Sequence, residues 1–267
     1  MILCADDFGL RDDITEAVLT LVRRGKLSAV SCMVVLDHCD TNCLSELLAH
    51  QSEVDVGLHF CLTDVGLPLE VAASGVVLSP LFPSFRVLLR KALLRQVKAR
   101  DITLQISNQY ALFLKKCGRR PDFIDGHLHV HQLPNIRSGL LDFVSSLPPE
   151  CRPYIRNTRV SMLNLRSRRL PWLKACLIGF FGAQIWSQLH SRGLPTNEGF
   201  AGIYDFKRGS KYHEYLPRFI DCLPQLNSIL VVHPGHQEEW RQREFIALSE
   251  FSFAPGALNR FQQQPRG

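Results

Sequence analysis

The sequence predicts an α/β fold built on a largely parallel β-sheet with helices on both faces. Short, continuously apolar segments alternate with segments of helical periodicity from the first residues onward. Strands that are buried on both faces of a parallel sheet have this uninterrupted apolar character. The 267 residues are 46% hydrophobic and 21% charged, which suffices for a packed core and excludes wholesale disorder.

Five strands and the helices between them can be assigned along the chain. Strands are expected in the apolar runs at residues 2–5, 30–36, 54–62, 123–128 and 228–232. Helices are expected where apolar residues recur at helical spacing, at 14–22 with a stop at Gly25, at 44–48, over most of 85–117, after Pro134 and at 171–191. This alternation of strands and helices is typical of a parallel sheet.

The chain shows no internal repeat, low-complexity linker or sharp change of composition. We therefore expect a single domain over residues 1–255, followed by a polar C-terminal tail, 256–267, that frays. The first five residues are apolar and lead directly into two acids, which does not resemble a signal peptide. We expect a cytoplasmic protein.

The net charge indicates the class of binding partner, and the cysteines indicate the cellular compartment. Lys and Arg total 31 against 25 Asp and Glu, a net charge of +6, which suits an anionic substrate or membrane surface. The excess is too small to predict a nucleic-acid partner. Nine cysteines without a Cys-x-x-Cys pair predict thiols in a reducing compartment rather than a disulfide framework or a zinc knuckle.

Acidic and histidine residues lie at the carboxyl ends of four expected strands. Asp6 and Asp7 follow the first strand, His59 lies near the end of the third, and His233 follows the last. The segment 125–131, Asp-Gly-His-Leu-His-Val-His, ends the fourth. Because the carboxyl ends of parallel strands form one rim, we expect these side chains to form a single cluster.

One carboxylate and two imidazoles commonly hold a divalent ion while leaving positions open for water and substrate. We predict Asp7, His59 and His127 as the ligands of a divalent ion, Mg²⁺ or Zn²⁺. Asp6 then remains free as a base, and His233 is placed to donate a proton to a leaving group. Asp125 is placed to orient one of the imidazoles.

Each of these residues also has a simpler explanation when it is taken alone. An Asp after a strand often caps the next helix, and a single His within a strand is more often a hydrogen-bonded core residue than a ligand. His127, His129 and His131 are spaced by two, so an extended segment would place all three imidazoles on one side. That clustering favours function, although the roles of His129 and His131 stay open.

The same segments resemble the motifs of the YdjC/ChbG family of carbohydrate deacetylases. The resemblance rests on Ala-Asp-Asp-Phe-Gly at 5–9, Gly-Leu-His-Phe-Cys-Leu-Thr at 57–63, the histidine-rich segment at 125–131 and His-Pro-Gly at 233–235. It implies a distorted or incomplete (β/α) barrel related to the polysaccharide deacetylase fold. It also implies metal-dependent removal of an N-acetyl group from an amino sugar, typically a chitooligosaccharide.

Residue by residue, Asp6 matches the family's catalytic base and His233 its candidate acid. Asp7, His59 and His127 match the metal ligands. Two departures affect the comparison. Gly126 stands where the family has Ser, and residues 64–120 and 150–225 carry no family motif, so we expect the loops there to select the substrate. Members of the family often form dimers, and the resemblance is compatible with a homodimer.

Two other functions remain open. A glycoside hydrolase would use Asp6 or Asp7 with Asp125 and no metal, but this leaves the histidines unexplained. A non-catalytic carbohydrate- or lipid-binding module is supported by the basic residues at 86–100 and 152–174. For 86–100 a solvated helix face is favoured over membrane contact.

The aromatic-rich stretch 170–186 has two explanations. A buried helix is favoured, because large aromatic side chains usually serve the core. A lid over the site or a patch that contacts lipid is the alternative.

Overall fold

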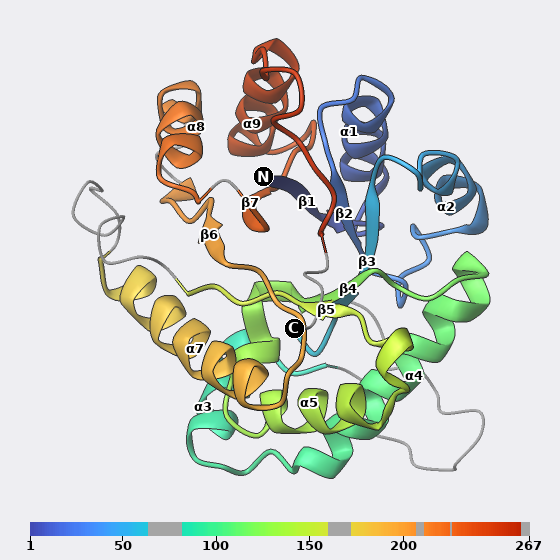
Figure 1. Cartoon of the computed structure of the whole chain (residues 1–267), viewed down its shortest axis with the longest axis vertical. Coiled ribbons are helices and arrows are strands. Elements are labelled where there is room, and N and C mark those ends of the chain that lie inside the picture. The colour runs from blue at the N-terminus through green and yellow to red at the C-terminus, as the bar shows by residue number, and fades with distance from the viewer. Residues whose placement is uncertain (64–81, 160–171, 207–210, 225, 263–267) are drawn as a thin grey trace.

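The computed structural model describes residues 1–63, 82–159, 172–206, 211–224 and 226–262 (Figure 1). Seven parallel strands form one sheet in the order β5-β4-β3-β2-β1-β7-β6. The strands are β1 Ile2–Phe8, β2 Ala29–Cys32, β3 Asp55–Phe60, β4 Phe123–Gly126, β5 Tyr154–Ile155, β6 Gly199–Ala201 and β7 Ser228–Val232. The predicted α/β class with a parallel sheet is confirmed.

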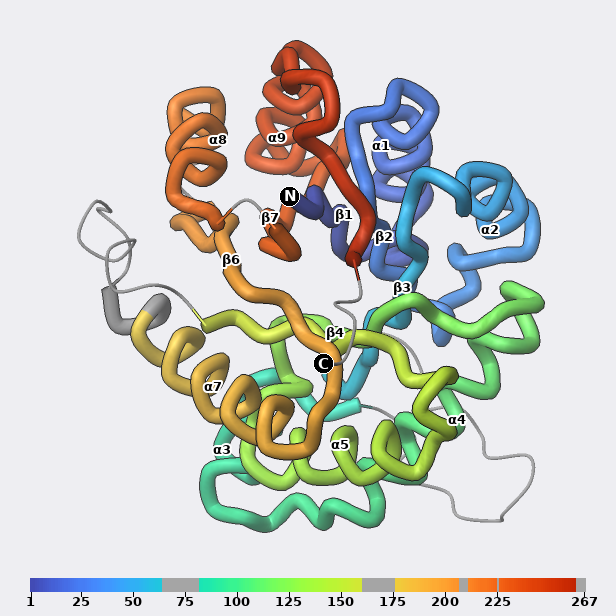
Figure 2. Tube along the Cα trace, viewed as in Figure 1, coloured from blue at the N-terminus to red at the C-terminus, as the bar shows by residue number. Residues whose placement is uncertain are grey.

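Helices surround the sheet on its outer side (Figure 2). The described α-helices are α1 Asp12–Arg23, α2 Thr41–Leu48, α3 Phe85–Leu93, α4 Ala99–Cys117, α5 Ile136–Ser146, α7 Trp172–Ser191, α8 Tyr212–Asp221 and α9 Glu239–Glu250. There are also two described 3-10 helices. The first, η1 His127–Gln132, directly follows β4, and the second, η2 Pro149–Cys151, precedes β5. Within the described ranges, no helix combines the length and the apolar character needed to cross a membrane.

The sheet curls until its two edge strands approach each other. The amide of Ile155 in β5 donates to the carbonyl of Pro195, and Ile155 forms a parallel bridge with Thr196, shortly before β6. The side chains of Asn157 and Asn197 are hydrogen-bonded across the same seam at 3.3 Å. The result is a curled half-barrel with outer helices, which confirms the incomplete (β/α) barrel that the family resemblance implies.

Local sequence features explain where several of the helices begin and end. The helix α1 begins with Asp12 and Asp13, whose charges are favourable at a helix N-terminus. The helix α2 begins after Asp40, whose carboxylate accepts bonds from the amides of Asn42 and Cys43. The helix α4 ends at Gly118 with φ 65°, a left-handed conformation that glycine adopts without a steric penalty.

The structure differs from the sequence prediction in the lengths of some strands. The strand β2 ends at Cys32 rather than at residue 36, because the chain turns after Met33, whose carbonyl accepts from the amide of Leu36. The short strands β5 and β6 and the helices α8 and α9 were not predicted. Two or three residues are too few to give a recognisable apolar run.

The part of the C-terminal tail that the structure describes, 256–262, packs against the amino end of the sheet. The amide of Asn259 donates to the carbonyl of Met1, and the ring of Phe261 stacks on Tyr154 at 4.1 Å between centroids. Arg260 forms an ion pair with the buried Asp55 at 2.6 Å. The expectation that this stretch frays is therefore wrong.

The aromatic stretch that includes α7 is only partly buried. Phe181 faces the core and is 6% exposed, whereas Phe180 is 58% exposed. Residues 170 and 171 lie outside the described residues. The prediction of a buried helix holds for one face of α7 and not for the other.

Candidate active site

The first two acids lie where the backbone of β1 changes conformation. Successive residues of a regular strand point to opposite faces of the sheet. The register between β1 and β2 shifts between Ala5 and Phe8, and Asp7 takes a positive φ of 68°. Such an irregularity redirects a side chain, and it brings Asp7 toward histidines of β3 and η1.

Three predicted ligands converge at the carboxyl ends of β1, β3 and β4. The Oδ1 atom of Asp7 lies 3.2 Å from Nδ1 of His127 and 3.4 Å from Nε2 of His59. One ligand atom from each of the three residues lies within 4.8 Å of the others. All three side chains are at most 12% exposed. The structure therefore places Asp7, His59 and His127 together.

His59 is held in this orientation by a hydrogen bond at Nδ1, the ring nitrogen that faces away from Asp7. Its Nδ1 donates to Oδ1 of Asp125 at 2.7 Å, and the hydroxyl of Ser31 donates to the same oxygen at 2.6 Å. The bond fixes which imidazole nitrogen faces Asp7. Although burial disfavours the charged imidazole, the carboxylates of Asp125 and Asp7 raise the pKa of His59 to about 10.

A divalent ion fits between Asp7, His59 and His127. One carboxylate and two imidazoles are a usual donor set for such an ion, and a carboxylate behind the metal-binding imidazole is a usual companion. Burial raises the pKa of Asp7, but bonds with His127 and His59 and the charge of Arg241 outweigh it and hold the pKa well below its usual range. The carboxylate of Asp7 is therefore ionised.

A second group of potential ligand atoms, on Cys4, Asp6 and Asp125, also lies within 4.8 Å. It is not a cation site, because the guanidinium of Arg156 already fills it. Both oxygens of Asp6 accept from Arg156 at 2.7 Å, and Oδ2 of Asp125 lies 2.5 Å from the same guanidinium. Burial of the Cys4 thiol raises its pKa, so the thiol stays protonated.

Arg156 also corrects the prediction that Asp6 is free. The guanidinium is fully buried and engages both carboxylate oxygens of Asp6. A bidentate pair of this kind fixes the orientation of the carboxylate while leaving each oxygen a further lone pair. Arg156 directly follows the two-residue strand β5, which is too short to be recognised in the sequence, so no local signal points to this residue.

Replacing Arg156 with methionine should lower the free energy of unfolding by about 3–5 kcal/mol, because it leaves buried carboxylates on Asp6 and Asp125 without their counter-charge. Urea unfolding followed by circular dichroism measures the change. Arg260→Met is the matched control, since Arg260 is 37% exposed and its pair with Asp55 should contribute less. Equal losses in the two variants would contradict this account.

His233 follows β7 and is held by α9 through its backbone. Its amide donates to the carboxylate of Glu244 at 2.5 Å, and its carbonyl accepts from Arg241 at 3.3 Å. Arg241 also donates to Oδ2 of Asp7 at 2.7 Å. One helix therefore fixes His233 relative to the predicted ligand Asp7. Neither Arg241 nor Glu244 was singled out from the sequence.

The imidazole of His233 packs against two aromatic rings, and its Nδ1 lies 4.0 Å from the carboxylate of Glu244. The rings of Phe206 and Trp240 approach it edge-on at 5.5 Å and 6.0 Å between centroids. Burial lowers the pKa of His233 to about 4, against the opposite effect of the Asp7 and Asp6 carboxylates. At pH 7 the imidazole is then neutral in the free protein.

Glu244 is fully buried and accepts a bond from the hydroxyl of Tyr204 at 2.5 Å. Burial raises its pKa from 4.5 to about 7. Between these values the folded protein binds a proton at Glu244 that the unfolded chain does not bind, so this residue lowers the free energy of unfolding as the pH rises. His233, with its lowered pKa, contributes the opposite slope between pH 4 and 6.5.

Because of Glu244, the free energy of unfolding of wild type should fall by about 3 kcal/mol between pH 4.5 and 7. This fall should be absent in Glu244→Gln. The measurement is the difference in free energy of unfolding between wild type and variant across this range. A difference that does not change with pH would show that Glu244 keeps its ordinary pKa.

The other two histidines do not face the ligands. Leu128 and His129 have left-handed φ values of 53° and 59°, which kink the chain inside η1, so the segment is not extended. The Nε2 of His131 donates to the carbonyl of Arg156 at 2.9 Å, and the ring of His129 lies edge-on to Phe200. The prediction that the three imidazoles share one side is wrong.

The contacts of His131 also account for Gly126. A Cβ atom at position 126 would lie 2.9 Å from Nδ1 of His131 and 3.1 Å from its Cβ. A serine there would require His131 to shift. The glycine that replaces the family's serine is thus matched to the position of this histidine.

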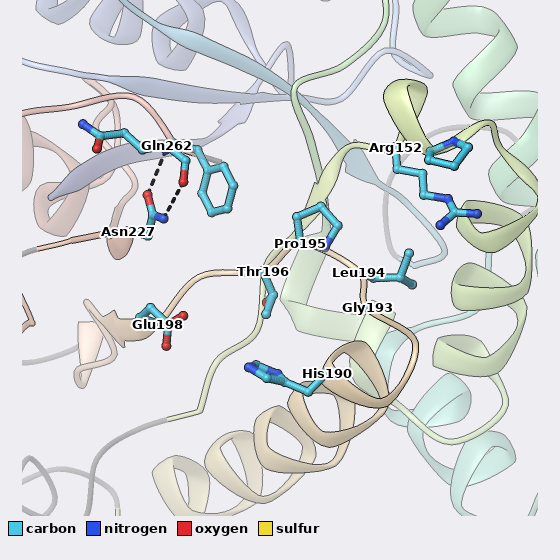
Figure 3. A pocket seen from close by; sticks show the side chains of 11 residues that line it. Arg152, His190, Gly193, Leu194, Pro195, Thr196, Glu198, Asn227 and Gln262 are labelled. Carbon is cyan, nitrogen blue, oxygen red and sulfur yellow. Dashed lines mark hydrogen bonds between the residues drawn. The ribbon is translucent and has the colours of Figure 1, made fainter. Parts of the chain in front are cut away.

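A cleft of about 210 Å³ lies elsewhere, at the amino ends of β5, β6 and β7 (Figure 3). Its lining includes Arg152, His190, Glu198 and Asn227, and Asn227 is hydrogen-bonded to the backbone of Gln262. None of the lining residues belongs to the cluster of acids and histidines. Because catalytic groups of parallel α/β folds gather at the carboxyl ends, we place the candidate active site at that cluster.

Comparison with known proteins shows the family of the chain. The model of the family described as YdjC-like protein matches residues 1–255. Proteins named chitooligosaccharide deacetylase from Yersinia pestis (strain Pestoides F) and Yersinia pseudotuberculosis serotype O:3 (strain YPIII) are each 30% identical over 188 residues, which cover 69% of this chain and 70% of theirs.

A solved structure has a similar fold. The crystal structure of a putative cellobiose-phosphate cleavage protein from Enterococcus faecalis V583 superposes with a TM-score of 0.61. The match covers 93% of this chain and 90% of that chain, at 18% sequence identity. At this identity the similarity shows the fold and not the activity.

Proposed function

The chain belongs to the YdjC-like protein family, and we propose that it is a metal-dependent hydrolase that removes the N-acetyl group from an amino sugar. The observation that carries the proposal is the convergence of Asp7, His59 and His127 beside the paired Asp6 and the partly buried His233. The names of the relatives, chitooligosaccharide deacetylases, support an N-acetylated oligosaccharide as substrate.

Asp7, His59 and His127 would hold the divalent ion. When bound, such an ion lowers the pKa of water and stabilises negative charge on an attacked carbonyl oxygen. The protein's contribution is a ligand carboxylate that is already ionised and an imidazole fixed by Asp125. Imidazole ligands suit Zn²⁺, and the family resemblance is equally compatible with Mg²⁺, so both ions belong in the test.

Asp6 is the base in this proposal. Arg156 holds both of its oxygens, so the carboxylate cannot rotate away from the direction in which it accepts a proton. A proton taken from the attacking water at Asp6 leaves the nucleophile ready to add to the acetamide carbonyl. Positioning of this kind is the main contribution that a buried, bidentate pair makes to catalysis.

His233 is the acid that protonates the departing amine. An amine cannot leave as its anion, so the nitrogen must receive a proton as its bond to the acetyl carbon breaks. Since the free protein holds His233 neutral, the imidazole must take up a proton from solvent in the substrate complex before it can protonate the amine. The carboxylates of Asp6 and Asp7 favour the charged form, and α9 fixes the backbone of His233.

The surroundings of Asp125 disfavour the glycoside hydrolase alternative. Such an enzyme needs a second carboxyl group that can give up a proton near neutral pH. Asp125 is completely buried, and Arg156 and His59 lower its pKa despite the opposing effect of burial. Its oxygens already bind Ser31, His59 and Arg156. It is therefore a positioning group.

Acetate release from a panel of N-acetylglucosamine oligosaccharides tests the proposal. We expect release from at least one member, its loss after treatment with a chelator, and its recovery when Mg²⁺ or Zn²⁺ is added back. Release that is insensitive to the chelator would contradict metal dependence. Cleavage of glycosidic bonds without acetate would favour the glycoside hydrolase. Binding of the saccharides without any product would favour a non-catalytic module.

A further inference from the structure

The outward face of α3 and the turn after it combine basic and aliphatic side chains. Six basic residues between 86 and 100 are exposed, and the acid closest to them in sequence is Asp101. They are Arg86, Arg90, Lys91, Arg95, Lys98 and Arg100. We call these residues, with Val87, Leu93 and Leu94, the α3 surface.

The aliphatic side chains of the α3 surface are accessible to solvent. Val87 is 45% exposed, Leu93 53% and Leu94 55%. The helix is anchored to the core by other residues, Leu88 and Ala92, which are 6% and 0% exposed. With 3.6 residues per turn, Leu94 lies on the side of the helix opposite this anchor, together with Arg86 and Arg90.

The exposed aliphatic side chains distinguish this surface from an ordinary solvated helix face. From the sequence alone, the leucines of an arginine-rich helix are expected to pack inward while the charges face water. Here the core contact is already satisfied by Leu88 and Ala92, and three large aliphatic side chains remain outside among the charges. Apolar side chains that are exposed together and rimmed by polar groups are typical of a binding surface. The acid nearest to the α3 surface in sequence, Asp101, forms an ion pair with Arg100 at 3.5 Å.

We propose that the α3 surface docks the protein on an anionic lipid bilayer. Basic side chains are attracted to acidic headgroups, and adjacent aliphatic side chains enter the boundary between headgroups and acyl chains. The long arginine and lysine side chains allow both contacts at once. The inserted residues are aliphatic rather than aromatic, which favours lipid over single-stranded nucleic acid, where aromatic rings stack on bases.

Co-sedimentation of the full chain with vesicles tests this inference without reference to enzymatic activity. Vesicles of phosphatidylcholine alone are compared with vesicles that contain about one third phosphatidylglycerol, which supplies the negative surface charge. We expect binding to the anionic vesicles at low salt and release at about 0.5 M salt, where surface charges are screened within a few ångströms. The outcome does not depend on the proposed deacetylase activity.

Two variants change the surface itself. Removing three cations in Arg86→Gln/Arg90→Gln/Lys91→Gln should weaken the partition coefficient roughly 100-fold. Removing two aliphatic side chains in Leu93→Ser/Leu94→Ser should weaken it about tenfold or more while leaving the net charge unchanged. All of these side chains are exposed, so we expect both variants to keep the melting temperature of wild type.

Matched controls carry the same changes on other faces. Arg24→Gln/Lys115→Gln/Arg218→Gln removes three exposed cations, and Leu226→Ser/Ile246→Ser removes two side chains that are 44% and 50% exposed. Both controls should bind like wild type.

Several results would overturn the assignment. These are failure of wild type to sediment with anionic vesicles, an equal loss in the control variants, or binding that survives both changes in the α3 surface. Loss of heparin binding in the α3 variants, when wild type binds heparin but not vesicles, would instead assign the surface to a polyanion.

Discussion

Replacing Asp7 with asparagine is expected to weaken the binding of a divalent ion by more than about 100-fold and to remove acetate release. Asparagine has the same shape and tolerates the positive φ of 68° found at this position, so the backbone should not change. Its amide oxygen can still accept the bond from Arg241. What is lost is the negative charge that faces His59 and His127. Titration calorimetry with Mg²⁺ and Zn²⁺ measures the effect.

Asp55→Asn is the matched control for this experiment. Asp55 is a buried carboxylate of β3 that pairs with an arginine, but it lies at the opposite end of the strand from His59. Its replacement should lower stability and leave ion affinity unchanged. If Asp7→Asn retains wild-type affinity for both ions, Asp7 is not a ligand and the assignment of the site must be abandoned.

The second large effect is expected at Asp6. Asp6→Asn should lower kcat by about 10²–10⁴-fold while leaving KM and ion affinity close to wild type, because a general base acts in the transition state and not in binding. Steady-state acetate release and calorimetry on the same preparation separate these quantities. The substitution also removes the negative charge opposite Arg156, so the fraction of folded protein is measured in parallel.

Arg156→Lys distinguishes the chemistry of Asp6 from its positioning. Lysine keeps a positive charge beside Asp6 but cannot make the two parallel bonds of the guanidinium. We expect an intermediate loss of kcat in this variant. Activity of Asp6→Asn within a few-fold of wild type would mean that another group takes the proton, and His233 would be the next residue to examine.

The sequence predicted the parts of the site that follow long apolar strands. Asp7, His59 and His127 stand at the ends of β1, β3 and β4, whose residues are all buried, and a continuous apolar run marks each of these strands. Strand ends of a parallel sheet share one rim, so the convergence of these side chains followed from topology alone. The structure confirms their proximity.

The residues that hold this cluster in place could not be predicted in the same way. Arg156 follows a strand of only two residues, and Arg241 and Glu244 belong to a helix that is rich in charged residues. Arginine and glutamate at such positions are usually solvated. Here, tertiary contacts with Asp6, Asp7 and the backbone of His233 bury them, and no local pattern encodes those contacts.

The histidine-rich segment shows where local pattern reasoning fails. A spacing of two residues places side chains on one side only if the backbone stays extended. Two consecutive positive φ values, at Leu128 and His129, turn the chain within the motif. His127 therefore contacts Asp7, and His131 donates to the backbone of Arg156 instead.

The central claim is that Asp7, His59 and His127 bind a divalent ion on which acetate release depends. The most direct test is to remove bound ions with a chelator, titrate Mg²⁺ or Zn²⁺ back, and follow ion content and acetate release in the same sample. We expect both to rise together and to saturate at one ion per chain. Full acetate release from protein that holds no ion would contradict the claim.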